Sequence, residues 1–175
     1  HGKGWQEYLK GVVWTLQEVK WSLSGWEGVV AGDVPQDAGL SSSAALEMAC
    51  IRAFTEVSGI SWEPHTAAKL AQRAETEWNG ISCGIMDQLI SACGVAGHVL
   101  FIDCSNLEIQ PIAFPDGLSV IVLDTKTRRG LVDSLYNERH SQCKEASRIL
   151  GKSLLREVSL AELEAQTSRL NPLLY

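Results

Sequence analysis

Residues 33–47 read DVPQDAGLSSSAALE, and within this stretch a turn passes directly into a helix. Pro35 and Gly39 break the preceding pattern, whereas residues 41–58 are rich in Ala, Leu, Glu and Met, which favour helix. A helix N-terminus offers unpaired N–H groups and the positive end of the helix dipole. Small side chains let phosphate oxygens approach such an end, and a serine hydroxyl can reach Mg²⁺. The stretch therefore predicts a phosphate-binding turn.

Neither of the two common nucleotide-binding patterns accounts for this turn. The stretch contains no GxxxxGK pattern, because no Lys follows the glycine, and no GxGxxG pattern. On these residues alone, an equally good interpretation is that Ser41, Ser42 and Ser43 only cap the helix, as serines often do.

The remaining elements follow from hydrophobic periodicity and from turn residues. In chain order we expect a helix over the first twenty residues, a strand at 25–32, the helix at 41–58, a helix from Pro64 to about Trp78 and a helix at about 85–93. Three strands should follow at 98–104, 108–114 and 118–124, paired as an antiparallel meander. The chain should end with a helix at 131–150 and a last helix whose capping box is Ser159 and Glu162. This α+β layout mixes helices and strands without the regular βα alternation of a Rossmann sheet.

Composition excludes several classes of protein. The 175 residues, 45% of them hydrophobic, suffice for one buried core. An excess of acidic residues gives a net charge of -6, which argues against nucleic acid or an anionic membrane as the main partner. Five cysteines without a CxxC pair favour the reducing cytoplasm. No apolar run reaches a membrane span, and a start without Met or a signal peptide suggests a piece of a longer protein.

Residues 35–47 resemble PxGxGLSSSAxLE, the second motif of the GHMP small-molecule kinases. Three further segments are similar to the galactokinase branch of that family, namely ISCGIMDQLISACG at 81–94, LFIDCSNLE at 100–108 and RRGLVDSLYNERHSQC at 128–143. The resemblance implies a partial GHMP kinase fold with a ribosomal protein S5 domain 2-like N-terminal domain. Residues 1–124 would be the later part of that domain, and 125–175 the start of the C-terminal domain. The implied reaction is ATP-dependent phosphorylation of galactose at its anomeric hydroxyl, giving galactose 1-phosphate.

The resemblance also implies a role for each matching residue. The ATP phosphates would lie against Asp37, Ala38, Gly39, Leu40, Ser41, Ser42 and Ser43. Ser43 and Glu75 would supply oxygen ligands to Mg²⁺, the implied cofactor. Asp87 would accept the proton of the attacking sugar hydroxyl, and Arg128 would stabilise the Asp87 carboxylate. Gly84, Asp87 and Tyr136 would contact the sugar.

Each of these roles has a purely structural alternative. Glu75 lies four residues beyond Ala71, within about 40° of it on a helix, and could reach water from the edge of the apolar stripe. Asp87 suits a first helical turn for its charge alone. Tyr136 could be a packing residue, and Arg128 a solvated charge. We expect no metal role for Cys83, and none for the isolated histidines, His65, His98 and His140.

The chain departs from the family pattern at two matching positions. Asp37 replaces a glycine beside the phosphates, and His140 replaces a second arginine. The family's opening motif, GRxNLIGEHTDY, and its glycine-rich third motif do not occur in the chain, so we expect this piece alone to be weakly active or inactive. Other functions stay open: a sensor that binds galactose and ATP without turnover, a kinase for N-acetylgalactosamine or arabinose, or an inert fragment. The sequence does not predict an oligomeric state.

Overall fold

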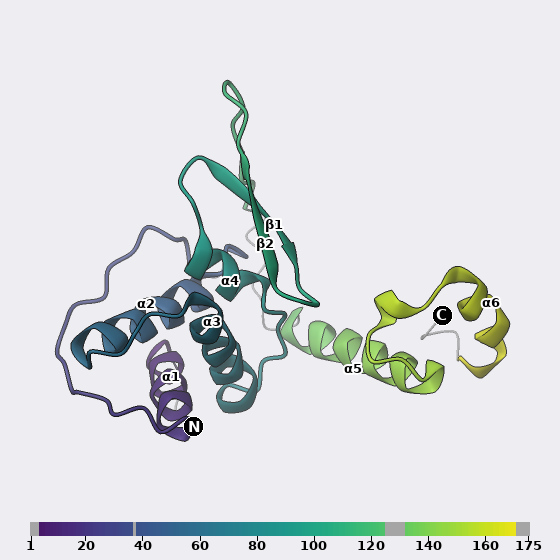
Figure 1. The fold of residues 1–175 in the computed structure, drawn as a ribbon, viewed down its shortest axis with the longest axis horizontal. Coiled ribbons are helices and arrows are strands. Elements are labelled where there is room, and N and C mark those ends of the chain that lie inside the picture. The colour runs from purple at the N-terminus through teal and green to yellow at the C-terminus, as the bar shows by residue number, and fades with distance from the viewer. Residues whose placement is uncertain (1–3, 37, 125–131, 171–175) are drawn as a thin grey trace. The chain divides into compact units, whose positions relative to one another are not determined.

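The computed structural model describes residues 4–36, 38–124 and 132–170 (Figure 1). The chain divides into two compact units, His1–Thr127 and Arg128–Tyr175, and each is described by itself. The first unit contains α1 (Gln6–Glu18), α2 (Ser42–Val57), α3 (Pro64–Arg73), η1 (Ala74–Trp78), α4 (Met86–Cys93), β1 (His98–Asp103) and β2 (Glu108–Ala113). The mixed α+β class is therefore as predicted. Within the described ranges, no helix has both the length and the apolar character that crossing a bilayer requires.

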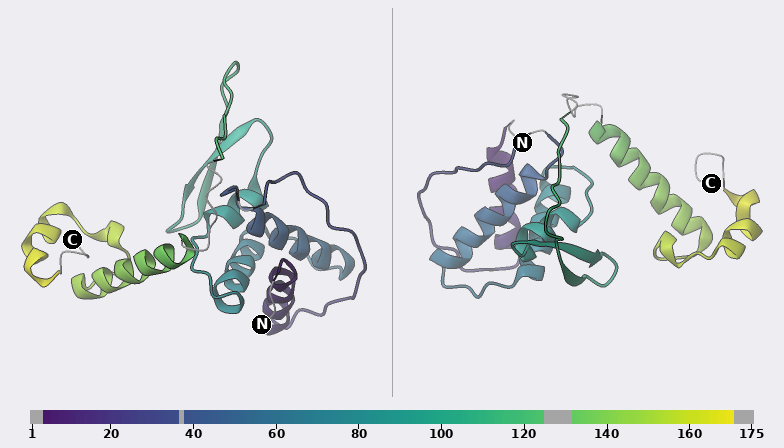
Figure 2. Two further views of the ribbon diagram at one scale, coloured as in Figure 1. Left: turned by 180° about the vertical axis from the view of Figure 1, so that it is seen from behind. Right: turned by 90° about the horizontal axis from the view of Figure 1, so that it is seen from above.

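Three helices enclose the main core of the first unit. Both views of Figure 2 show α1, in purple, lying against α2, in blue. The core residues are Val12 and Leu16 of α1, Met48, Cys50 and Ile51 of α2, Ala67, Leu70 and Ala71 of α3, and Ala74 of η1. Alanines on α3 let the helices approach closely, and the apolar contacts fix the direction in which the N-terminus of α2 points.

The last turn of the helix that begins at Pro64 is wider than an α-helical turn. In η1, the Asn79 N–H donates to the Ala74 carbonyl at 3.2 Å, five residues back, which makes this a π-helical turn. Trp78 packs on Gly11 of α1, where an added Cβ would lie 3.1 Å from the Trp78 Cβ. The indole N–H also donates to a carboxylate oxygen of Glu7 at 3.3 Å. Helix α1 therefore holds in place the turn that carries Glu75.

A second, smaller cluster joins α4 to the hairpin. Ala68 of α3, Ile85 and Leu89 are buried together, with Ile102, Leu107 and Ile109 of the hairpin packed against them. Strands β1 and β2 pair antiparallel, from His98 opposite Ala113 to Asp103 opposite Glu108. The predicted hairpin is confirmed, and its contacts fix α4 beside α3.

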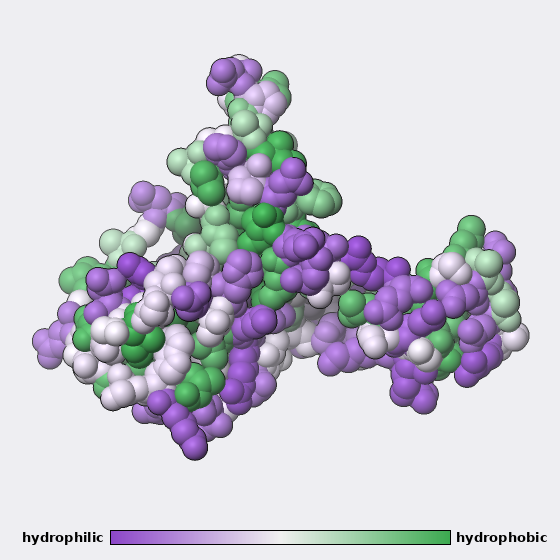
Figure 3. All heavy atoms as spheres, in the orientation of Figure 1, coloured by the Kyte–Doolittle hydropathy of each residue, from purple (hydrophilic) through white to green (hydrophobic). Residues whose placement is uncertain are grey.

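Two predicted strands are wrong. Residues 25–32 and 118–124 form no strand, and Val29 and Leu123 are 95% and 84% exposed. A strand needs a neighbour to pair its N–H and C=O groups, and the two-stranded sheet of the described residues includes neither segment. The predicted three-stranded meander is therefore a hairpin. Figure 3 shows hydrophobic side chains at the surface over this hairpin. Phe101 of β1 is 65% exposed.

The second unit is helical. It contains α5 (Val132–Leu150), α6 (Leu160–Gln166) and two short 3₁₀ turns, η3 (Leu155–Glu157) and η4 (Thr167–Arg169). The predicted capping box is confirmed, because the Glu162 N–H donates to Ser159 Oγ at 3.3 Å and the Ser159 N–H donates to Glu162 Oε2 at 2.8 Å. Ala146, Leu150 and Leu170 form its core.

Candidate functional site

Helix α2 begins after Ser41, whose side chain does not cap the first backbone donors of the helix. Ser41 precedes the helix with φ of 58°, a left-handed conformation that is rare outside glycine, and its side chain makes no capping hydrogen bond. The first backbone bond of the helix comes from the Ala45 N–H to the Ser41 carbonyl, at 3.0 Å. Capping by Ser41 therefore does not account for the serine run.

Ser43 and Glu75 meet directly, although 32 residues separate them in the chain. The Ser43 hydroxyl donates to Glu75 Oε1 at 2.9 Å, and Glu75 is only 6% exposed. A hydroxyl and a carboxylate are oxygen donors of the kind that Mg²⁺ prefers, and a rotated hydroxyl would direct its lone pair toward a bound ion. The two predicted metal-binding side chains are thus together and fit that ion.

The second oxygen of Glu75 is held by α4 and by the loop before it. Gln88, which is fully buried, donates from Nε2 to Glu75 Oε2 at 2.9 Å. The Cys83 thiol lies 3.6 Å from the same oxygen. Burial, and next the charge of Glu75, raise the pKa of Cys83 to about 12, so the thiol stays protonated and donates. Gln72 fixes the loop by donating to the Cys83 carbonyl at 3.1 Å.

A second carboxyl group, Glu47, lies fully buried one turn after Ser43. Burial, followed by the nearby charge of Glu75, raises its pKa to about 9, and Gln88 offsets part of that rise. No hydrogen bond of ordinary geometry joins Glu47 to Gln88, because neither oxygen of Glu47 nor Oε1 of Gln88 has a partner among the described residues. Glu47 is therefore neutral at pH 7.

Asp87 occupies the first turn of α4, next to Gln88 in the chain. It is half-buried, and no hydrogen bond or ion pair within the described ranges holds its carboxylate. Two hydrogen bonds therefore lead from Ser43 through Glu75 to the residue beside Asp87. Gly84 lies exposed in the loop that precedes α4. Helix α2, the turn η1 and helix α4 thus bring Ser43, Glu75 and Gln88 together, with Asp87 next to Gln88 in the chain.

Three of the predicted site residues cannot be placed in that region. Asp37 and Arg128 lie outside the described residues. Tyr136 belongs to α5 of the second unit and is 49% exposed. Within the described ranges, no group of three or more His, Cys, Asp or Glu side chains could hold a metal without further ligands. Ser43 and Glu75 would therefore need phosphate oxygens and water to complete a coordination shell.

Sequence reasoning missed Gln88 and Glu47. Glu47 stands between Leu46 and Met48, and Gln88 precedes Leu89 and Ile90. Glu47 also follows Ser43 by four residues, which places the two on one helix face. A charged or amide side chain at a core position requires a partner. That requirement was the signal that could have identified them.

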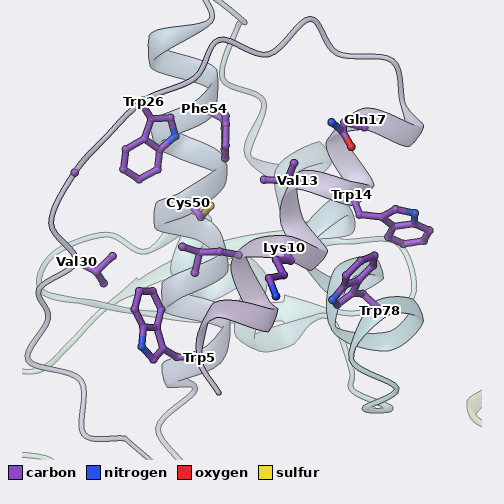
Figure 4. Close-up of a pocket in the computed structure, with 12 residues that line it drawn as sticks. Trp5, Lys10, Val13, Trp14, Gln17, Trp26, Val30, Cys50, Phe54 and Trp78 are labelled. Carbon is purple, nitrogen blue, oxygen red and sulfur yellow. The ribbon is translucent and has the colours of Figure 1, made fainter. Parts of the chain in front are cut away.

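A separate cavity of about 530 Å³ lies between α1, α2 and residues 26–30 (Figure 4). Aromatic rings line much of it, with Trp14 beside Trp78 and Trp26 edge-on to Phe54. None of the predicted site residues lines this cavity. Its lining is mostly apolar, and Lys10 already pairs with Glu7 at 2.6 Å, so the cavity offers little chemistry.

Comparison with known proteins identifies a family and a related fold. Residues 7–95 match the family described as "GHMP kinases N terminal domain". The structure also resembles the crystal structure of Lactococcus lactis galactokinase complexed with galactose, with a TM-score of 0.75 and 26% sequence identity. That match covers 96% of this chain and 45% of the galactokinase chain, so this chain spans less than half the length of that galactokinase.

Proposed function

This chain belongs to the GHMP kinase family, and we propose that it contributes the phosphate and metal site of an ATP-dependent galactokinase. The observation that carries the proposal is the direct contact between Ser43, at the head of α2, and Glu75. Glu75 in turn accepts a hydrogen bond from Gln88, the residue that follows Asp87 in the chain. We assign residues 1–124 to the N-terminal domain of that enzyme and 125–175 to the start of its C-terminal domain.

The first function of the site is to bind the triphosphate. The uncapped N-terminus of α2 would donate backbone N–H groups to phosphate oxygens, while its dipole attracts their negative charge. Ser43 and Glu75 would hold Mg²⁺, which neutralises phosphate charge when bound. Burial of Glu47 as a neutral acid keeps a second negative charge away from the phosphates.

The second function is to accept a proton. The anomeric oxygen of the sugar attacks the γ-phosphorus, the bond from that phosphorus to the bridging oxygen of ADP breaks, and the hydroxyl proton passes to the Asp87 carboxylate. A carboxylate suffices because proton transfer is late in a loose transition state. Arg128 would stabilise that carboxylate, and Gly84 and Tyr136 would contact the sugar. The leaving group is ADP, and the other product is galactose 1-phosphate.

Replacement of the proton acceptor tests this assignment. For Asp87→Asn we expect sugar and ATP binding within about tenfold of wild type, roughly 1.4 kcal/mol, and turnover lower by orders of magnitude. Asp116→Asn is the matched control, because Asp116 is an exposed aspartate outside the site. The assay should use the intact protein that carries this chain. Unchanged turnover in Asp87→Asn would remove Asp87 from the reaction.

The sequence supports one alternative function. Asp37 places a carboxylate where the motif has glycine, which favours a sensor that binds galactose and ATP without turnover. N-acetylgalactosamine and arabinose remain alternative sugars.

We propose small molecules as the only ligands, with no nucleic-acid or membrane partner, because the net charge is -6. We propose a cytoplasmic location because each of the five cysteines, all of them in described segments, is a free thiol.

A further inference from the structure

Gln88 is a fully buried amide in helix α4. Its Nε2 group donates to Glu75 Oε2 at 2.9 Å, and its neighbour in the chain is Asp87. We propose that Gln88 is a positioning residue that fixes the rotation of the Glu75 carboxylate, so that Oε1 stays on the Ser43 side for the ion. This inference rests on the proposed function of Glu75 as a ligand of Mg²⁺.

The two carboxylate oxygens of Glu75 accept hydrogen bonds from different residues. Oε2 accepts from Gln88 and from the Cys83 thiol, whereas Oε1 accepts from Ser43. The terminal torsion of a glutamate is broad, so a carboxylate without donors can turn either oxygen to either side. Two donors on Oε2 remove that freedom before a metal arrives. Loss of a residue that hydrogen-bonds to a metal ligand typically lowers metal affinity by about 10- to 100-fold.

The amide of Gln88 is itself restricted to one orientation. With Nε2 toward Glu75, the amide donates to a carboxylate; the flipped amide would set two acceptors against each other. Its Oε1 is buried without a partner among the described residues, as are both oxygens of Glu47. The 2.9 Å contact of Nε2 with Glu75 therefore fixes which end of the amide faces the carboxylate.

The backbone around Gln88 is held independently of its amide. Ile85 and Leu89 are buried with Ala68 in the cluster that joins α4 to α3 and the hairpin. Replacing Gln88 with Met, which has a similar length and no hydrogen-bonding amide, should therefore leave α4 in place. The loss should fall on Glu75, because the variant removes the amide donor to Oε2 and leaves the weaker Cys83 thiol at that oxygen.

Binding of Mn²⁺ to the intact protein carrying this chain measures the effect without catalysis. Mn²⁺ prefers the same oxygen ligands as Mg²⁺ and is detected by electron paramagnetic resonance. The titration is done with a non-hydrolysable ATP analogue present. We expect Gln88→Met to weaken Mn²⁺ binding by about 10- to 100-fold. Thr55→Val is the control, because Thr55 is also buried but donates only to the Arg52 carbonyl within α2.

A double-variant cycle separates positioning from a general loss of structure. In a Glu75→Gln background, Gln88→Met should weaken Mn²⁺ binding by less than about twofold, because the carboxylate it positions is already gone. Gln88→Glu, which keeps the size of the side chain, should lose at least as much affinity as Gln88→Met. It serves as the second variant if the first unfolds.

Three results would overturn the inference, and they differ from one another. Affinity within about twofold of wild type in Gln88→Met and Gln88→Glu would show that Glu75 needs no positioning. An equal loss in the wild-type and the Glu75→Gln backgrounds would show that Gln88 acts through the fold. Failure of the wild-type protein to bind Mn²⁺ with the nucleotide would overturn the proposed function itself, and this inference with it.

Discussion

Replacing Glu47 by Gln should make the protein more stable at high pH than the wild type. The wild-type carboxyl group is fully buried, and burial and Glu75 raise its pKa from 4.5 to about 9. Between those values the folded state holds a proton that the unfolded state has released, so the free energy of unfolding falls as pH rises. Below 4.5 both states are protonated, and above about 9 both are ionised, so the slope vanishes outside this window.

The magnitude follows from the same pKa values. Each pH unit inside the window costs about 1.4 kcal/mol, and pH 7 lies about 2.5 units above 4.5, so the wild type loses about 3 kcal/mol by pH 7. Gln at position 47 has no proton to lose. Its amide adds buried N–H donors that cost about 1–3 kcal/mol if unpaired, but this penalty does not change with pH.

Urea unfolding at several pH values between 5 and 9 measures the difference. We expect the free energy of unfolding of Glu47→Gln, minus that of wild type, to rise by about 1.4 kcal/mol per pH unit. Glu27→Gln is the matched control, because Glu27 is exposed and reports what the loss of one surface charge does. A difference for Glu47→Gln that is flat across this range would refute the claim that Glu47 is buried as a neutral acid.

Three further predictions concern the phosphate turn, the core and the second unit. Asp37→Gly should tighten ATP binding by about threefold to tenfold, since it removes a charge worth about 1 kcal/mol near the phosphates; calorimetry showing weaker binding would contradict this. Ile51→Ala empties a fully buried position of the main core and should cost about 2–5 kcal/mol in urea unfolding, so a cost below about 1 kcal/mol would be inconsistent. Ser159→Ala should lower the stability of α6 by about 1 kcal/mol, because it removes the capping side chain. An unchanged thermal unfolding midpoint of this unit would argue against the capping box.

The helices were predictable from sequence because their signals are local. The apolar spacing of α1, the helix-favouring composition of α2, Pro64 at the start of α3 and the Ser159–Glu162 pair each lie within one element. The segments at 25–32 and 118–124 were not predictable in the same way. Their apolar, β-branched residues favour strands, but a strand forms only where another segment supplies hydrogen-bond partners, and that is a tertiary property.

The candidate site was predictable where a motif carries it, and not where packing creates it. Ser43 and Glu75 were paired as metal ligands from the resemblance, and the structure places them 2.9 Å apart. The π-helical turn that carries Glu75 has no sequence signature, and the buried pair of Gln88 and Glu47 depends on how α2 and α4 approach each other. Neither feature can be deduced from periodicity along a single helix.

Phosphorus NMR of the intact protein with galactose, ATP and Mg²⁺ tests the central claim most directly. We predict that a sugar phosphate resonance grows as the γ-phosphate signal of ATP declines, and that this conversion stops in Asp87→Asn. Binding of galactose and ATP with no sugar phosphate formed by the wild-type protein would contradict the kinase assignment and favour the sensor.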